Sequence, residues 1–136
     1  MEITRVVVDT DILIDLLRNV KKVLEFISDM ERKEYVLSTT IINAFELFHG
    51  AYRSKKQSEN LASTRRLLER LIILGMSLKS AESADRIYAE LETKRQPIGL
   101  RDAMVGAITL TRGYVLATRN IEHLQRIPNL TLVQAP

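Results

Sequence analysis

The chain has 136 residues, of which 46% are hydrophobic and 27% charged, with a net charge of +3 that favours an acidic partner only weakly; this composition is typical of one globular domain spanning residues 1–136. It contains no cysteine and only two histidines, which excludes disulfides, thiolate catalysis and a zinc site built from cysteine or several histidines. The longest apolar runs, such as 71–76, are far shorter than the roughly 20 residues of a membrane span, so we expect a cytoplasmic protein.

The first predicted strand consists of three consecutive valines at 6–8, and apolar residues at helical spacing follow from 12 to 17. A strand that ends in acids and leads into a helix is typical of an open α/β sheet, whose ligands bind beyond the carboxyl ends of the strands. We expect Asp11 to cap the helix, which leaves Asp9 without a structural task. Asp15, one turn further on, is expected to be peripheral and solvated.

Helices and strands alternate along the rest of the chain. Further helices are expected at 20–31, at 40–52 with Thr39 or Thr40 as the cap, and at 61–71, 81–91 and 102–112; further strands are expected at 35–38, 72–78, 114–117 and 130–133. The polar stretch 53–60 is expected to be an exposed loop or an extended helix end. This alternation implies an α/β fold with a mainly parallel, five-stranded sheet that is covered on both faces.

Three acids of this predicted fold are candidates for a site. Asp9 follows a strand, Glu46 lies in an apolar helix, and Asp102 opens a helix of small residues. Two of them have an ordinary alternative, since Asp102 by itself is a helix cap and Glu46 is an exposed residue beside the apolar stripe. His49 and His123 are expected to have surface or packing roles.

Together, the acids suggest a metal site. Asn120 lies at the end of a strand, as Asp9 does, so the same edge of the sheet is a plausible meeting point. Carboxylates about 4 Å apart repel by several kcal/mol, so a cluster of them needs a cation. Oxygen ligands select Mg²⁺ or Mn²⁺, and such an ion is suited to phosphodiester hydrolysis because it activates a water molecule.

Four segments, in this order, resemble the motifs of the PIN-domain family, specifically the ribonuclease toxins of VapBC-type toxin–antitoxin pairs. They are 7–17 (VVDTDILIDLL), 45–51 (FELFHGA), 97–107 (PIGLRDAMVGA) and 117–120 (ATRN). Each motif alone is weak, but the order and spacing extend over essentially the entire chain. The resemblance implies a three-layer α/β/α sandwich with the acids at one edge of the sheet.

The resemblance also implies a site and its partners. Asp9, Glu46 and Asp102 correspond to the metal-binding acids of a Mg²⁺- or Mn²⁺-dependent ribonuclease, and Asn120 takes the fourth catalytic position, where some relatives have Asp. Thr10 and Thr118 correspond to polar residues beside the metal. Similar proteins are homodimers that are inhibited by an antitoxin, whose tail enters the acidic pocket and through which any DNA binding occurs.

The expected mechanism is in-line attack on an RNA phosphodiester by metal-activated water, which Glu46 orients or deprotonates. Arg101 and Arg119 would hold the RNA backbone, together with Thr10 and Thr118. The placement of the two arginines is a hypothesis from their adjacency to the acids in the sequence.

Three other families or roles share part of this pattern. Haloacid-dehalogenase-type phosphatases share the strand–Asp-x-Asp opening, but here Ile12 and Leu13 follow instead of the residues that family needs. A receiver-type phosphoacceptor needs a late lysine after a strand, which Arg119–Asn120 replaces poorly. A non-catalytic PIN-like module that only docks RNA or a protein is a third alternative. Retention of all three acids argues against it, because an unused acid cluster costs stability.

Overall fold

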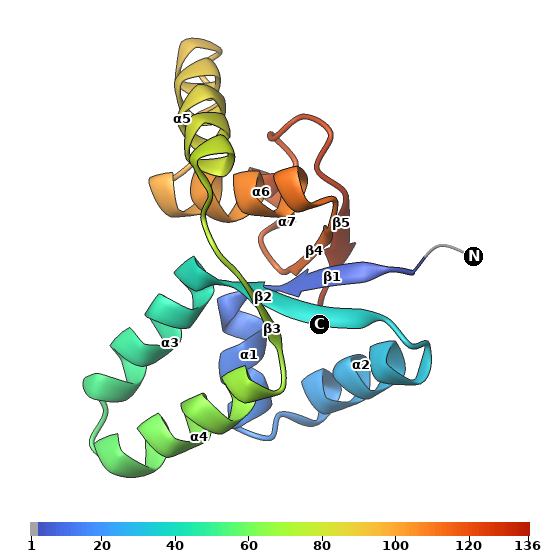
Figure 1. The fold of residues 1–136 in the computed structure, drawn as a ribbon, viewed down its shortest axis with the longest axis vertical. Helices are drawn as coiled ribbons and strands as arrows, with labels where there is room; N and C mark the ends of the chain where they lie inside the picture. Colours follow the sequence, from blue (N-terminus) through green and yellow to red (C-terminus); the bar gives the residue numbers. More distant parts are fainter. Residues whose placement is uncertain (1–2) are drawn as a thin grey trace.

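The centre of the fold is a five-stranded sheet, seen in a computed structural model that describes residues 3–136 (Figure 1). The strands are β1 (Arg5–Val8), β2 (Val36–Thr40), β3 (Ile72–Leu74), β4 (Val115–Thr118) and β5 (Leu132–Gln134). Their order is β3-β2-β1-β4-β5, and every pairing is parallel. The predicted parallel sheet is therefore confirmed, with β1 in its middle.

Helices cover both faces of this sheet and complete the three layers (Figure 1). One face carries α1 (Thr10–Leu17), α2 (Lys21–Arg32), α3 (Ile41–Tyr52) and α4 (Gln57–Glu69), and the other carries α5 (Leu78–Thr93), α6 (Leu100–Arg112) and α7 (Ile121–Leu124). Among the described residues, no helix is long and apolar enough to cross a membrane.

The three valines of β1 show why the sheet is buried on both sides. Side chains alternate between the two faces of a strand, so Val7 packs into the core beneath α5 and α6, while Val6 and Val8 pack into the core beneath α1 and α2. All three are at most 1% exposed. A run of consecutive apolar residues is the expected pattern for a parallel strand between two helical layers.

Several predicted boundaries are wrong, and local capping explains the largest error. The strand predicted at 72–78 ends at Leu74, because Ser77 and Ser80 form a reciprocal capping box that starts α5 at Leu78. The polar stretch 53–60 is a loop only as far as residue 56, since α4 begins at Gln57. The last strand lies at Leu132–Gln134 rather than at 130–133.

Candidate active site

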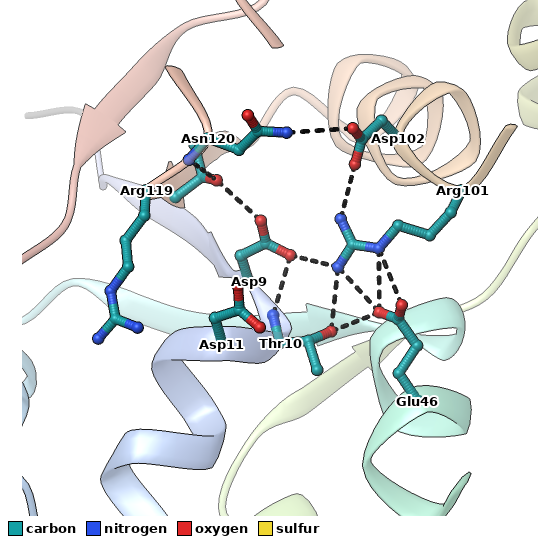
Figure 2. Close-up of a pocket in the computed structure, with 9 residues that line it drawn as sticks. Asp9, Thr10, Asp11, Glu46, Arg101, Asp102, Arg119 and Asn120 are labelled. Carbon is teal, nitrogen blue, oxygen red and sulfur yellow. Dashed lines mark hydrogen bonds and ion pairs between the residues drawn. The ribbon is translucent and has the colours of Figure 1, made fainter. Parts of the chain in front are cut away.

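A pocket of about 530 Å³ opens at the carboxyl edge of the sheet, where β1 and β4 end beside the starts of α1, α6 and α7 (Figure 2). Its lining residues come from segments that are far apart in the sequence: Asp9, Thr10, Asp11, Glu46, Arg101, Asp102, Thr118, Arg119 and Asn120. The structure thus brings the three candidate acids, Asn120 and both candidate arginines to one place.

Asp9 is the N-cap of α1, and the prediction that Asp11 takes this role is wrong. The backbone of Asp9 is extended, and its Oδ1 accepts a hydrogen bond from the amide of Thr10 at 2.9 Å. The helix therefore begins before the first apolar residue, Ile12, and Asp11 is an exposed residue of its first turn. Asp9 therefore caps α1, a structural role that was not expected from the sequence, and it also lines the pocket.

Two side chains from other elements fix the Asp9 carboxylate, which is almost fully buried. Thr118, the last residue of β4, donates from Oγ1 to Asp9 Oδ2 at 2.8 Å. Asn43, in the first turn of α3, donates from Nδ2 to Asp9 Oδ1 at 3.1 Å. Since both contacts join separate elements to the end of β1, the orientation of this carboxylate is set by the fold.

Asn43 is a site residue that the sequence analysis missed. Its amide oxygen accepts hydrogen bonds from the backbone and hydroxyl of Thr40, the N-cap of α3, while its amide nitrogen reaches Asp9 and Thr10. The spacing Thr40-x-x-Asn43 was a usable signal, because it follows the capping-box pattern with Asn in place of Glu or Gln. The pattern alone did not show that the same amide also reaches an acid.

Glu46 lies one turn further along α3 and points into the pocket (Figure 2). Its Oε1 accepts a hydrogen bond from the Thr10 hydroxyl at 2.6 Å. The Glu46 side chain is 31% exposed, compared with 9% for that of Asp9. Glu46 is therefore the more accessible of these two acids.

The Arg101 guanidinium lies between the three acids, rather than only beside them (Figure 2). Its Nη2 donates to Asp9 Oδ1 at 2.5 Å and to Glu46 Oε1 at 2.8 Å, and its Nη1 donates to Asp102 Oδ1 at 2.8 Å. Its Nε donates to both oxygens of Glu46 at 3.0 Å. Burial works to lower the pKa of Arg101, but hydrogen bonds and charge from Glu46, Asp9 and Asp102 outweigh it, so the pKa lies above its usual range.

Asp102 is not a helix cap, because the N-cap of α6 is Gly99 and Asp102 lies in the first turn. Its second oxygen, Oδ2, accepts a hydrogen bond from Nδ2 of Asn120 at 3.2 Å. The amide oxygen of Asn120 in turn lies 2.8 Å from Nδ1 of His123. Asn120 thus holds Asp102 from the β4 side of the pocket.

Arg119 lines the same pocket, but its hydrogen bonds go to residues outside the acid cluster. Its Nη2 donates to Asp15 Oδ2 at 2.7 Å, and its Nε donates to the carbonyl oxygen of Pro136 at 2.5 Å. Asp15 is therefore peripheral, as expected, but it is paired with a cation rather than simply solvated. Figure 2 shows the Arg119 side chain extending away from Arg101 and Glu46.

The donor set suits a divalent cation of the hard type. Asp9, Glu46 and Asp102 each place an oxygen within 3.0 Å of one guanidinium, and carboxylate oxygens are the ligands that Mg²⁺ and Mn²⁺ prefer. Within residues 3–136, however, no three acids lie close enough together to ligate one ion. The guanidinium of Arg101 lies between them, so the acids suit a metal ion in their chemistry but are not arranged around one in this structure.

Comparison with known proteins agrees with the fold and with the sequence motifs. The PIN domain family model matches residues 6–130. The chain is 33% identical over 91 residues to a tRNA(fMet)-specific endonuclease VapC of Salmonella typhimurium, covering 67% of this chain and 69% of that protein. It is 29% identical to ribonuclease VapC2 of Haemophilus influenzae, covering 88% and 89%. The structure of Rickettsia felis VapBC2 bound to a promoter DNA fragment superposes with a TM-score of 0.87 at 26% identity, covering 96% of this chain and 98% of that one.

Proposed function

The chain belongs to the PIN-domain family, and from this premise we propose that it is a metal-dependent endoribonuclease, the toxin of a toxin–antitoxin pair. Its similarity to VapC ribonucleases extends over most of its length, which confirms the resemblance seen in the four motifs. The observation that carries the proposal is the convergence of Asp9, Glu46 and Asp102 on one cationic group in an open pocket.

Asp9, Glu46 and Asp102 are the residues that would hold the metal ion, Mg²⁺ or Mn²⁺. When bound, such an ion supplies activation of a water molecule and neutralisation of the charge that grows on the phosphoryl oxygens. Support comes from the acids' surroundings, because hydrogen bonds from Thr118 and Asn120 orient Asp9 and Asp102. Ligands that are held in this way need little reorganisation when a cation arrives.

Glu46 is the proposed proton acceptor for the attacking water. It is 31% exposed, and its Oε1 is held by the Thr10 hydroxyl. Access to solvent and a fixed orientation are what a general base needs. Asn120 is proposed to act through Asp102, whose Oδ2 it holds.

The RNA backbone is proposed to bind Arg101 and Arg119, with the hydroxyls of Thr10 and Thr118 beside the reacting phosphate. All four residues line the pocket of about 530 Å³. Guanidinium groups bind phosphates through paired hydrogen bonds, which gives both charge and orientation.

The proposed partners are a cognate antitoxin and a second copy of the chain, with DNA bound only through the antitoxin. Among the solved relatives, VapBC2 of Rickettsia felis is bound to a promoter DNA fragment, and another structure is a toxin–antitoxin complex from Klebsiella pneumoniae.

Cleavage of a mixed tRNA and rRNA pool tests the proposal. We expect the purified, antitoxin-free chain to cut RNA with Mg²⁺ or Mn²⁺, to stop with chelator, and to lose cleavage in Asp102→Asn. Asp85→Asn, which changes an exposed acid on α5, is the matched control and should cleave as the wild type does. A folded, metal-loaded wild type that binds RNA without cutting it would instead support the non-catalytic PIN-like RNA- or protein-binding module.

A further inference from the structure

Two arginines line the pocket, and only one of them contacts the acids. Arg101 donates hydrogen bonds to Asp9, Glu46 and Asp102, whereas the hydrogen bonds of Arg119 go to Asp15 and to the Pro136 carbonyl. Within residues 3–136, the positive charge inside the acid cluster therefore comes from one side chain, that of Arg101.

The guanidinium uses the oxygen atoms that a metal ion would need. It occupies Oδ1 of Asp9, Oε1 of Glu46 and Oδ1 of Asp102. An octahedral Mg²⁺ ion with oxygens about 2.1 Å away requires its neighbouring ligands to lie about 3 Å apart. A planar guanidinium between the same carboxylates prevents that approach, and two cations so close together repel each other.

We propose that Arg101 is a built-in counter-ion that closes the acid cluster against divalent cations, so that a metal ion enters only when the guanidinium swings out. This inference rests on the proposed function and adds a control of metal loading that is located in the toxin chain itself. A chelator-sensitive nuclease would then be inactive until Arg101 leaves the acids.

The acid cluster is built to survive the departure of Arg101. Asp9 keeps its bonds from Thr118 and Asn43, and Asp102 keeps its bond from Asn120. Glu46 likewise keeps the hydroxyl of Thr10. Each carboxylate therefore has a second donor that holds it in place while the guanidinium moves.

Arg101 also has room to move. It lies in the first turn of α6, its side chain is 31% exposed, and the pocket that it borders has a volume of about 530 Å³. When it swings outward it can bind a phosphate of the RNA backbone. Because coupling between two ligands is reciprocal, RNA that holds the guanidinium outside the cluster would strengthen metal binding.

Metal affinity measured without RNA tests the inference. If Arg101 occupies the cluster most of the time, the apparent dissociation constant of Mn²⁺ is weakened by the small fraction of open sites. We expect calorimetric titration to give Arg101→Gln an affinity about tenfold or more above that of the wild type. Arg119→Gln removes the same charge from the same pocket without touching the acids, so its affinity should change by no more than about twofold to threefold.

An equal change in the two variants would overturn the inference, because the effect would then be one of net charge alone. Titration of the wild type with Mg²⁺, followed by NMR of the Arg101 Nε–H group, gives an independent answer if Arg101→Gln does not fold. The Nε–H bonded to Glu46 should be protected from solvent exchange before Mg²⁺ is added and should lose that protection afterwards. Unchanged protection with Mg²⁺ bound would contradict the inference.

The RNA cleavage assay separates this inference from the proposed function. If the wild type cuts RNA with metal but Arg101→Gln binds Mn²⁺ no more tightly than Arg119→Gln, only the role of Arg101 is wrong. If neither variant nor the wild type binds metal or cuts RNA, both proposals fail.

Discussion

The amide nitrogen of Asn43 donates a hydrogen bond to Oδ1 of Asp9 at 3.1 Å, and Asn43 is fully buried. The oxygen of the same amide accepts two hydrogen bonds from Thr40. One side chain therefore completes the capping box of α3 and fixes an acid at the end of β1, which ties the structure of the sheet edge to the geometry of the site.

Replacement of Asn43 by Ala should lower the free energy of unfolding by about 2–3 kcal/mol, because the substitution breaks the capping box of α3 and leaves the buried amide and hydroxyl of Thr40 without their acceptor. Urea unfolding measures this loss. Asn60→Ala removes an amide that donates to Ser54 on the exposed side of the molecule and should cost at most about 0.5 kcal/mol. If Asn43→Ala lowered the free energy of unfolding no more than Asn60→Ala does, the buried hydrogen bonds of Asn43 would contribute little to stability.

Thr118→Val should reduce RNA cleavage about tenfold while the chain stays folded. The substitution keeps the shape of the side chain but removes the hydroxyl that donates to Asp9 Oδ2 at 2.8 Å, and a loss near 1.4 kcal/mol in orientation corresponds to tenfold in rate. Thr109→Val is the matched control, because Thr109 is also fully buried and donates only to the Val105 carbonyl of its own helix. Single-turnover cleavage should be unchanged in that variant; a similar drop in both would contradict the role given to Thr118.

The sequence motifs were sufficient to predict the parallel sheet and to select Asp9, Glu46 and Asp102 as candidates. The sheet was predictable because the alternation of apolar strands and amphipathic helices is local, and the three acids lie near one another because the carboxyl ends of parallel strands meet at one edge. Element boundaries were less predictable where polar side chains cap helices. Ser77 is an example, since its capping box ended the predicted strand early.

The position of Arg101 could not be predicted from the sequence. Its place next to Asp102 suggested a residue beside the acids, but the direction of a long side chain depends on what the fold places in front of it. Here α3 brings Glu46 within reach across 55 residues of sequence. The double role of Asn43 was hidden for the same reason, because its contact with Asp9 exists only in the folded chain.

Gly106 should not tolerate a methyl group, although it lies in the middle of α6. A Cβ added there would lie 2.5 Å from Cδ1 of the buried Ile127. Overpacking should outweigh the gain in helix propensity, so Gly106→Ala should lose about 1–2 kcal/mol of stability. Gly50 in α3 has no described atom within 4 Å of such a carbon, so Gly50→Ala should gain up to about 1 kcal/mol. Thermal unfolding of both variants checks the opposite signs, and a stabilised Gly106→Ala would refute the close packing.

Arg119→Gln should weaken RNA binding and reduce its salt dependence. If Arg119 contacts a phosphate, the slope of log affinity against log salt should fall by about 1. Filter binding of catalytically inactive Asp102→Asn, with and without the second substitution, measures this slope. Arg126→Gln is the control, because Arg126 lies outside the pocket and donates to the Pro97 carbonyl; the same slope change there would mean that the effect is not local.

We propose that Asp9, Glu46 and Asp102 hold a divalent ion in exchange for the Arg101 guanidinium. Anomalous scattering from crystals soaked in Mn²⁺ tests it most directly. We predict a manganese peak ligated by oxygens of these three acids, with the Arg101 side chain turned out of the cluster. A peak located elsewhere, or Arg101 still bonded to the acids in crystals of a protein that cuts RNA with Mn²⁺, would contradict this account.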